Sequence, residues 1–212
     1  MKAFVLAILL LTGCASIPND TDMFMRARAS TVHIQAKNSK GVADGAGTGV
    51  VLNANCVLTA AHVLQDETEF RIETDNGDYW FASAKDAIID EDIDVGVLCR
   101  NDQTLNAPPV RIASKMPHLY SRVFTIGYPL GYSKVMTEGR YMGNALVTAQ
   151  AGPGNSGGGV FSDDLYIGFC DTIAMYRAEY GVLGFPHLEG IVEIDQIRAF
   201  LAIHHIPFTS ES

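Results

Sequence analysis

The stretch Gly152-Pro153-Gly154-Asn155-Ser156-Gly157-Gly158-Gly159 places a single serine inside a glycine-rich segment. A serine hydroxyl is a weak nucleophile until a neighbouring base accepts its proton during attack. The oxyanion that then forms needs backbone N–H donors already aimed at it, and glycines permit backbone conformations that a Cβ forbids. The stretch therefore predicts a nucleophilic Ser156, with an oxyanion hole formed by Gly154, Asn155 and Ser156. Taken alone, it also fits a glycine-rich turn with an incidental serine.

Two segments earlier in the chain supply the partners that such a serine needs. Val57-Leu58-Thr59-Ala60-Ala61-His62 places a histidine at the end of a β-like run, which predicts His62 as the base. Asp92-Ile93-Asp94-Val95-Gly96-Val97-Leu98 begins an apolar run with an acid, and a buried acid is costly without partners. Orienting the histidine N–H is one such use, so Asp94 is the candidate. The alternatives are an ordinary histidine and a solvated acidic turn.

Taken together, the three motifs resemble those of the chymotrypsin-fold serine peptidases, and specifically the bacterial Deg-type branch. The matching motifs are Thr59-Ala60-Ala61-His62, Asp94-Val95-Gly96-Val97-Leu98 and Gly154-Asn155-Ser156-Gly157-Gly158. Their order, His then Asp then Ser, is also that of the family, whereas other triad folds use different orders. The resemblance extends from about Gly45 to the C-terminal helix. Deg-type enzymes usually carry a PDZ domain after the peptidase, and none is expected here.

The resemblance implies an all-β fold of two packed six-stranded antiparallel barrels with a C-terminal α-helix. His62 and Asp94 would come from the first barrel and Ser156 from the second, with the triad in the cleft between them. The implied activity is that of a serine endopeptidase, which hydrolyses polypeptide substrates through an acyl-enzyme intermediate. The implied chemistry needs neither a metal nor a cofactor.

The resemblance also predicts the substrate pocket. Gln150 would lie near the base of the pocket for the residue before the cleaved bond, and without an acid there a strong preference for Arg or Lys is not expected. Asp171 would change this charge argument if it points inward. One wall of the pocket is expected from Phe169, Cys170, Asp171 and Thr172, and the other from the segment around Gly184.

The pattern of the remaining chain agrees with an all-β fold. From residue 30 onward, short β-like runs alternate with Gly, Asn, Asp and Pro, which is typical of a barrel or sandwich. Asp75-Asn76-Gly77-Asp78 predicts a hairpin turn between two such runs. Helical periodicity appears only at residues 193–203, which predicts an amphipathic C-terminal helix.

The first residues read as a targeting segment and not as part of the fold. Residues 1–13 combine Lys2 with an apolar run that is too short to span a bilayer, and they predict a signal peptide. Leu-Thr-Gly-Cys at residues 11–14 resembles a bacterial lipobox, which implies lipidation at Cys14. An ordinary signal peptide with an incidental cysteine is the alternative. Residues 14–29 are expected to form a tether, and residues 30–212 the peptidase domain.

Net charge and cysteine content bear on three further questions: nucleic-acid binding, disulfide bonds and metal sites. The net charge of -9 and a pI near 5.0 argue against a nucleic-acid partner. If Cys14 carries lipid, Cys56, Cys99 and Cys170 remain, and an odd number cannot all pair. We favour buried thiols, while a Cys56–Cys99 bridge stays open. The three lack the close spacing of a zinc site, so no metal is expected.

The sequence leaves the location and the rival function as hypotheses. The residues after Cys14, Ala15 and Ser16, lack the aspartate that retains lipoproteins at the inner membrane in enteric bacteria. We therefore expect export across the inner membrane and a lipid anchor at the outer membrane, facing the periplasm. The alternative function is a catalytically silent, lipid-anchored protein that binds peptides or serves a structural role in the envelope. The sequence does not determine the natural substrate or the oligomeric state.

Overall fold

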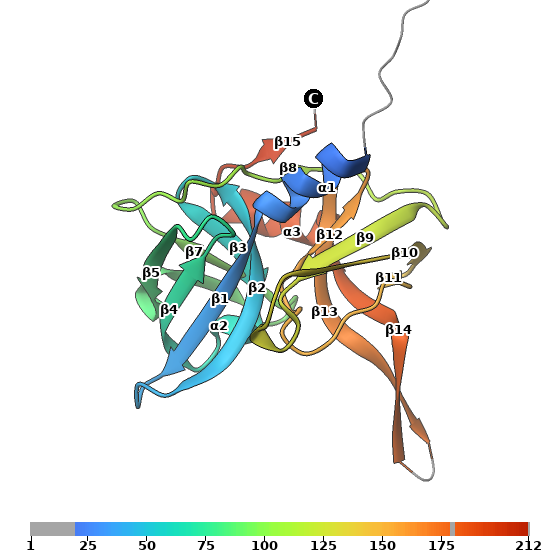
Figure 1. Ribbon diagram of the computed structural model, residues 1–212, viewed down its shortest axis with the longest axis horizontal. Coiled ribbons are helices and arrows are strands. Elements are labelled where there is room, and N and C mark those ends of the chain that lie inside the picture. The colour runs from blue at the N-terminus through green and yellow to red at the C-terminus, as the bar shows by residue number, and fades with distance from the viewer. Residues whose placement is uncertain (1–19, 179–180, 212) are drawn as a thin grey trace, which may run out of the picture.

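The computed structural model describes residues 20–178 and 181–211, which form two mainly antiparallel β sheets packed against each other (Figure 1). The expected signal peptide, the lipidation site Cys14 and residues 14–19 of the expected tether lie outside the described residues. In the part of the chain that the structure describes, no helix combines the length and the apolar character that crossing a membrane requires.

The N-terminal sheet contains seven strands in the order β5-β4-β1-β2-β3-β7-β6. Their bounds are β1 Thr31–Asn38, β2 Ala43–Asn53, β3 Cys56–Ala60, β4 Glu67–Glu73, β5 Tyr79–Ser83, β6 Ala87–Asp90 and β7 Val95–Cys99. The expected turn at Asn76-Gly77 joins β4 to β5, which pair as a hairpin. Within the described residues the outer strands β5 and β6 do not pair with each other, so this sheet is a half-barrel rather than a closed ring.

The C-terminal sheet closes into a ring of six strands, β12-β9-β10-β11-β14-β13, because β12 also pairs with β13. Its strands are β8 Arg111–Ile112, β9 Arg122–Gly127, β10 Val135–Gly143, β11 Leu146–Val147, β12 Gly159–Ser162, β13 Leu165–Ala178, β14 Gly181–Glu193 and β15 Thr209–Ser210. Figure 1 shows β13 and β14 continuing beyond the ring as a long twisted ribbon. The predicted all-β class, with its antiparallel barrel architecture, is confirmed.

The helical segments are short and lie at the ends or between strands. They are α1 Asp20–Ala29, α2 Ala61–Leu64, α3 Ile194–Ile203 and the 3-10 turns η1 Ala84–Asp86 and η2 Pro129–Gly131. Helix α3 confirms the predicted C-terminal helix. It buries Ile194, Ile197 and Leu201, at the helical spacing that places them on one face.

Residues 20–29 were expected to belong to a tether, and they instead form helix α1. Met23 and Ala27, four positions apart, are buried on one face. The ring of Phe24 packs edge-on against Phe124, with ring centroids 4.9 Å apart. Lys134 Nζ donates a hydrogen bond to the carbonyl of Arg28 at 2.6 Å, near the C-terminal end of α1. The folded part of the chain therefore begins before Ser30.

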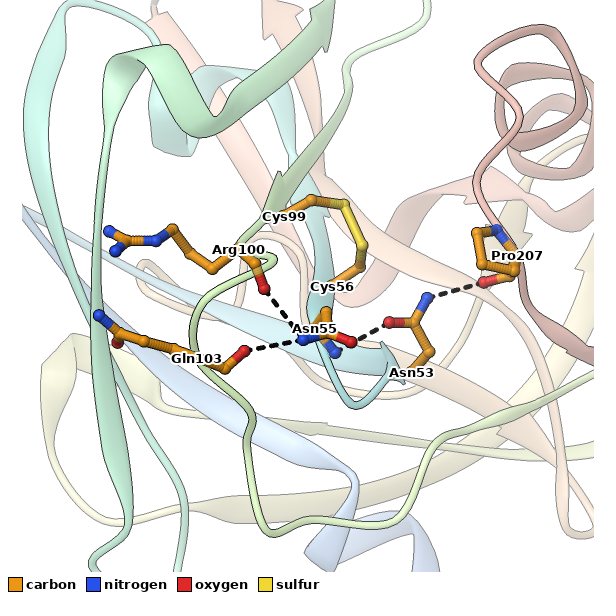
Figure 2. Close-up of a disulfide and its surroundings, with 7 residues drawn as sticks. All are labelled: Asn53, Asn55, Cys56, Cys99, Arg100, Gln103 and Pro207. Carbon is orange, nitrogen blue, oxygen red and sulfur yellow. Dashed lines mark hydrogen bonds between the residues drawn. A yellow bond between two sulfur atoms is a disulfide. The ribbon is translucent and has the colours of Figure 1, made fainter.

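A disulfide joins Cys56 to Cys99 (Figure 2). The expectation of buried thiols is therefore wrong for these two residues, and it is confirmed for Cys170, which is free and buried. The two cysteines lie opposite each other in the β3–β7 pair. The contact depends on the register of two strands that are distant in sequence, so the sequence pattern did not reveal it. Near Cys56, the side-chain amide of Asn55 donates to the carbonyls of Arg100 and Gln103 (Figure 2).

The disulfide lies at the opposite end of this strand pair from the predicted catalytic residues. Strand β3 begins with Cys56 and runs toward His62, whereas β7 begins just after Asp94 and ends at Cys99. The register continues from Cys56 opposite Cys99 to Ala60 opposite Val95. The covalent link thus fixes the relative position of the two strands that carry the histidine and the aspartate.

Candidate active site

His62 and Asp94 meet at the end of the β3–β7 pair. His62 is the second residue of α2, and its Nδ1 lies 2.8 Å from Asp94 Oδ2. The backbone N–H of His62 donates to Asp94 Oδ1 at 2.9 Å, and the N–H of Ala61 donates to the carbonyl of Asp94 at 3.0 Å. Asp94 adopts a left-handed backbone conformation with φ +52°, which costs energy for a residue with a Cβ. Both carboxyl oxygens of Asp94 therefore act on His62, one on its backbone and one on its ring.

The loop that carries Ser156 is bound to the N-terminal sheet through Thr48 of β2. The Thr48 N–H donates to the carbonyl of Ser156 at 2.9 Å, and its hydroxyl donates to the carbonyl of Gly154 at 2.8 Å. The same hydroxyl oxygen accepts the N–H of Tyr128 at 2.9 Å. The Thr48 side chain is fully buried between the two sheets. Thr48 thus places a serine from the C-terminal unit beside the strands that carry His62 and Asp94.

The backbone amides around Ser156 divide into bonded and open groups. The N–H of Asn155 donates to the carbonyl of Gly152 at 3.0 Å, and that of Gly157 to the carbonyl of Cys170 at 2.9 Å. Among the described residues, the N–H groups of Gly154 and Ser156 have no hydrogen-bond acceptor. The sequence-based assignment of Asn155 to the oxyanion hole is therefore corrected, because its amide already has an acceptor. Gly154 and Ser156 keep donors that can face a developing oxyanion.

Asp171 connects the histidine–aspartate pair with the serine loop. It is the extra residue at a bulge of β13, between Cys170, which pairs with Ile191, and Thr172. Bulges re-aim side chains and are common next to active sites. The ring of His62 and the carboxyls of Asp94 and Asp171 offer polar atoms within 4.8 Å of one another. Asp171 also lines the cavity beside Ser156, so it lies next to both the histidine–aspartate pair and the serine loop.

The carboxyl groups of Asp94 and Asp171 share a hydrogen bond. Burial and the bond to Asp94 raise the pKa of Asp171 to about 6. Burial alone would raise the pKa of Asp94, but hydrogen bonds from His62 and Asp171 lower it overall. Below about pH 6 protonated Asp171 therefore donates to ionised Asp94, and above that pH Asp171 is itself mostly ionised. The hydrogen bond to Asp94 raises the pKa of His62 above 6.5, against its partial burial, and the charges of Asp94 and Asp171 add to the rise.

A general base must be neutral to accept a proton, so the raised pKa of His62 sets the acid limb of activity. We expect kcat/KM for peptide hydrolysis to fall on acidification with a midpoint above pH 6.5. Asp171→Asn removes a nearby negative charge, which stabilises the imidazolium less, and should move the midpoint to lower pH. Rate profiles from pH 5 to 9 on one peptide substrate measure both values. A midpoint that stays in place or rises in the variant contradicts the assigned charge of Asp171.

Among the described residues, the His62, Asp94 and Asp171 cluster is the one arrangement with the donor types of a metal site. His62 Nδ1 and Asp94 Oδ2 are hydrogen-bonded directly to each other at 2.8 Å. Both atoms already have a partner in this arrangement. We therefore assign the cluster to proton transfer and not to metal binding.

The structure corrects several residues of the predicted substrate pocket. A cavity of about 240 Å³ borders Ser156, and its described lining consists of Ala151, Gly152, Pro153, Asn155, Ser156, Asp171, Thr172 and Glu189. Gln150 is exposed and is absent from this lining. Asp171 and Thr172, two of the predicted wall residues, line this cavity. The backbone of Gly184 pairs with that of Met175 in the β13–β14 ribbon.

Phe169 and Cys170 lie in the interior and not at the pocket surface. Both side chains are buried in the hydrophobic core. The N–H of Cys170 donates to the carbonyl of Gly158, and its carbonyl accepts the N–H of Gly157, both at 2.9 Å. The backbone of Cys170 therefore holds the serine loop. Because the N–H and the carbonyl of Cys170 are both bonded, a substrate backbone could pair with β13 only after Cys170.

Two residues of the site were not identified from the sequence. Thr48 lies in a Gly-Thr-Gly run that carries no catalytic signature, and its role depends on contacts over more than a hundred positions. Glu189 sits in β14 beside an apolar segment, and the pairing of β14 with β13 brings it to the cavity. The sequence offered one indication of Glu189: it is an acid inside a long β-like run, and buried strand positions rarely carry a charge.

Comparison with known proteins agrees with the geometry. The chain is 27% identical over 140 residues to a serine protease DegP homolog of Plasmodium falciparum, covering 58% of this chain and 16% of that protein. It is 26% identical over 152 residues to the chloroplastic protease Do-like 2 of Arabidopsis thaliana, covering 63% of this chain and 24% of that protein. The chain thus spans a quarter or less of the length of these curated relatives.

Solved structures share the fold. The serine endoprotease from Yersinia pestis superposes with a TM-score of 0.70 at 20% identity, covering 89% of this chain and 66% of that chain. The HtrA-type protease AlgW, solved with a tripeptide, gives a TM-score of 0.72 at 18% identity, covering 89% and 65%. At the level of sequence, residues 47–166, more than half of the chain and including all three predicted triad residues, match the trypsin-like peptidase domain family. The chain therefore belongs to the trypsin-like peptidase domain family.

Proposed function

We propose that this protein is a serine endopeptidase that uses His62, Asp94 and Ser156 as its catalytic triad. The observation that carries the proposal is the hydrogen bond of 2.8 Å between His62 Nδ1 and Asp94 Oδ2, beside Asp171, which lines the same cavity as Ser156. The open amides of Gly154 and Ser156 support it, since acyl transfer needs donors for the oxyanion. Family membership and the likeness to known proteases agree with this assignment.

The mechanism follows from the roles of these groups. Ser156 Oγ attacks the carbonyl carbon of a peptide bond while His62 accepts the hydroxyl proton through Nε2. Asp94 holds the Nδ1 proton and stabilises the imidazolium, and the Gly154 and Ser156 amides donate to the oxyanion. His62 then protonates the leaving amine, and the acyl group remains on Ser156. Water attacks this ester with His62 again as base, which releases the acid product and restores the hydroxyl.

A fluorophosphonate probe tests the proposal because it phosphonylates only an activated serine. We expect one adduct per chain, located at Ser156 by mass spectrometry of the peptides. Ser156→Ala should abolish both the adduct and peptide hydrolysis. Ser133→Ala is the matched control, since Ser133 is an exposed serine outside the cleft. An unlabelled wild-type chain, or labelling that persists in Ser156→Ala, would reject the triad.

We further propose that the chain is exported and anchored by lipid through Cys14 to the envelope membrane, at the outer membrane and facing the periplasm. The lipobox-like residues 11–14 support the anchor. The Cys56–Cys99 disulfide supports export, because such bonds persist in oxidising compartments such as the bacterial periplasm. Metabolic labelling with a radioactive fatty acid should mark the wild-type protein and spare Cys14→Ser. Equal labelling of both would reject the anchor at this residue.

A further inference from the structure

Two acidic side chains line the cavity beside Ser156. Asp171 contributes from the bulge of β13 and Glu189 from the neighbouring strand β14, where it pairs with Ile173. The rest of the described lining, which includes Ala151, Gly152 and Pro153, carries no charge. A Cβ built on Gly152 meets no atom within 4 Å. At about 240 Å³ the cavity is smaller than the roughly 300–1,000 Å³ typical of pockets for drug-sized ligands, which suits a single side chain.

Glu189 is the unusual member of this lining. Its side chain is only 3% exposed, and its Oε2 atom is buried without a hydrogen-bond partner. Among the described residues, the Cys170 thiol hydrogen-bonds to this carboxyl. Buried polar atoms are almost always paired, so an orphaned carboxyl oxygen in a cavity requires an explanation. A ligand that donates a hydrogen bond to Glu189 Oε2 would explain this unpaired atom.

The charges around Glu189 indicate which ligand fits. Among the described residues, no lysine or arginine forms an ion pair with Glu189 or Asp171. Burial, with the charge of Asp171 added, raises the pKa of Glu189 to about 7. The lining of the cavity therefore carries two carboxyl groups that form no ion pair with a described lysine or arginine. A cationic group in this position would pair with them and favour their ionised form, whereas a second acid would be repelled.

The cavity borders the nucleophile, so its occupant is the side chain of the residue whose carbonyl Ser156 attacks. We infer that this cavity selects a lysine or arginine at the residue before the cleaved bond, with Glu189 and Asp171 as the specificity-determining acids. The inference rests on the proposed peptidase function. It reverses the expectation drawn from Gln150, because the acids reach the cavity from β13 and β14 instead of from the segment before Ser156.

The first test compares peptide substrates that differ at this one residue. Norleucine matches lysine, and citrulline matches arginine, in length without the positive charge. We expect kcat/KM to be at least about tenfold higher for each charged residue, since hydrogen bonds to charged groups contribute about 1.5–3 kcal/mol. Glu189→Gln keeps the shape of the side chain and should reduce this ratio to within about twofold. A wild-type ratio near one, or an unchanged ratio in the variant, overturns the inference.

A second measurement separates this inference from the proposed function. Benzamidine is a small aromatic cation, and benzamide is its neutral analogue. On Ser156→Ala, which cannot form an acyl-enzyme, calorimetry should detect benzamidine binding and at least about tenfold weaker benzamide binding. This comparison uses one folded chain and needs neither catalysis nor a variant of Glu189. Binding without any hydrolysis by the wild type would reject the peptidase and keep the cation site. Equal or absent binding of the two compounds would reject the cation site even if peptides are cleaved.

Discussion

Replacing Asp94 with asparagine is expected to lower kcat about 10⁴-fold without unfolding the protein, as for the equivalent change in the known serine protease triad. The Asn Oδ1 atom can still accept the N–H of His62, which Asp94 Oδ1 accepts at 2.9 Å. Its amide group then faces Nδ1, where the aspartate oxygen lay at 2.8 Å. An amide donates, so Nδ1 becomes the acceptor and the ring proton moves to Nε2. In that tautomer Nε2 cannot accept the serine proton.

The matched control for this change is Asp92→Asn, two positions away in the same turn. Asp92 is exposed, and the structure shows no contact between its side chain and the cleft. Single-turnover rates on one peptide substrate, with thermal unfolding of each variant, separate catalysis from stability. A loss of less than tenfold in Asp94→Asn would mean that Asp94 does not set the tautomer of His62. An equal loss in both variants would point instead to the charge of the turn.

Replacing Gly157 with alanine is expected to destabilise the protein and remove most of its activity. A Cβ at this position would lie 2.2 Å from both the Thr48 carbonyl oxygen and the Thr59 hydroxyl, far inside van der Waals contact. The backbone also has φ +79°, which a residue with a Cβ adopts at a cost. Overpacking and backbone strain together should cost roughly 2–5 kcal/mol. Relief requires the serine loop to move away from Thr48, which displaces the oxyanion donors and should lower kcat at least about 100-fold.

Gly77→Ala is the control that separates backbone strain from the steric clash expected in Gly157→Ala. Gly77 has φ +81°, close to that of Gly157, but a Cβ there meets no atom within 4 Å. It should therefore lose about 1–2 kcal/mol of stability and no activity. Urea unfolding and kcat/KM of the two variants make the comparison. Similar losses in both variants would show that backbone strain alone explains the effect, and that close packing against Thr48 does not matter.

The sequence by itself determined the class of the fold, and it predicted the residues of the proposed triad. Each motif is a local run in which a β strand leads into or out of a polar residue, as at Ala61-His62 and Asp94-Val95, and such patterns depend on neighbouring residues. The C-terminal helix followed from the same local periodicity. Helix α1 was missed because its apolar face is narrow, with Met23 and Ala27 buried against the body of the protein by tertiary packing.

Only the tertiary structure decided what surrounds the triad. Thr48 positions Ser156 through bonds that cross between the two sheets, and Cys56 meets Cys99 through strand register. Glu189 reaches the cavity because β14 pairs with β13, the strand that also carries Asp171, whereas Gln150 lies outside the described lining. In each case the contact joins residues distant in the sequence. Local patterns of polarity specify strands and turns, but which side chains then meet depends on the register and closure of the sheets.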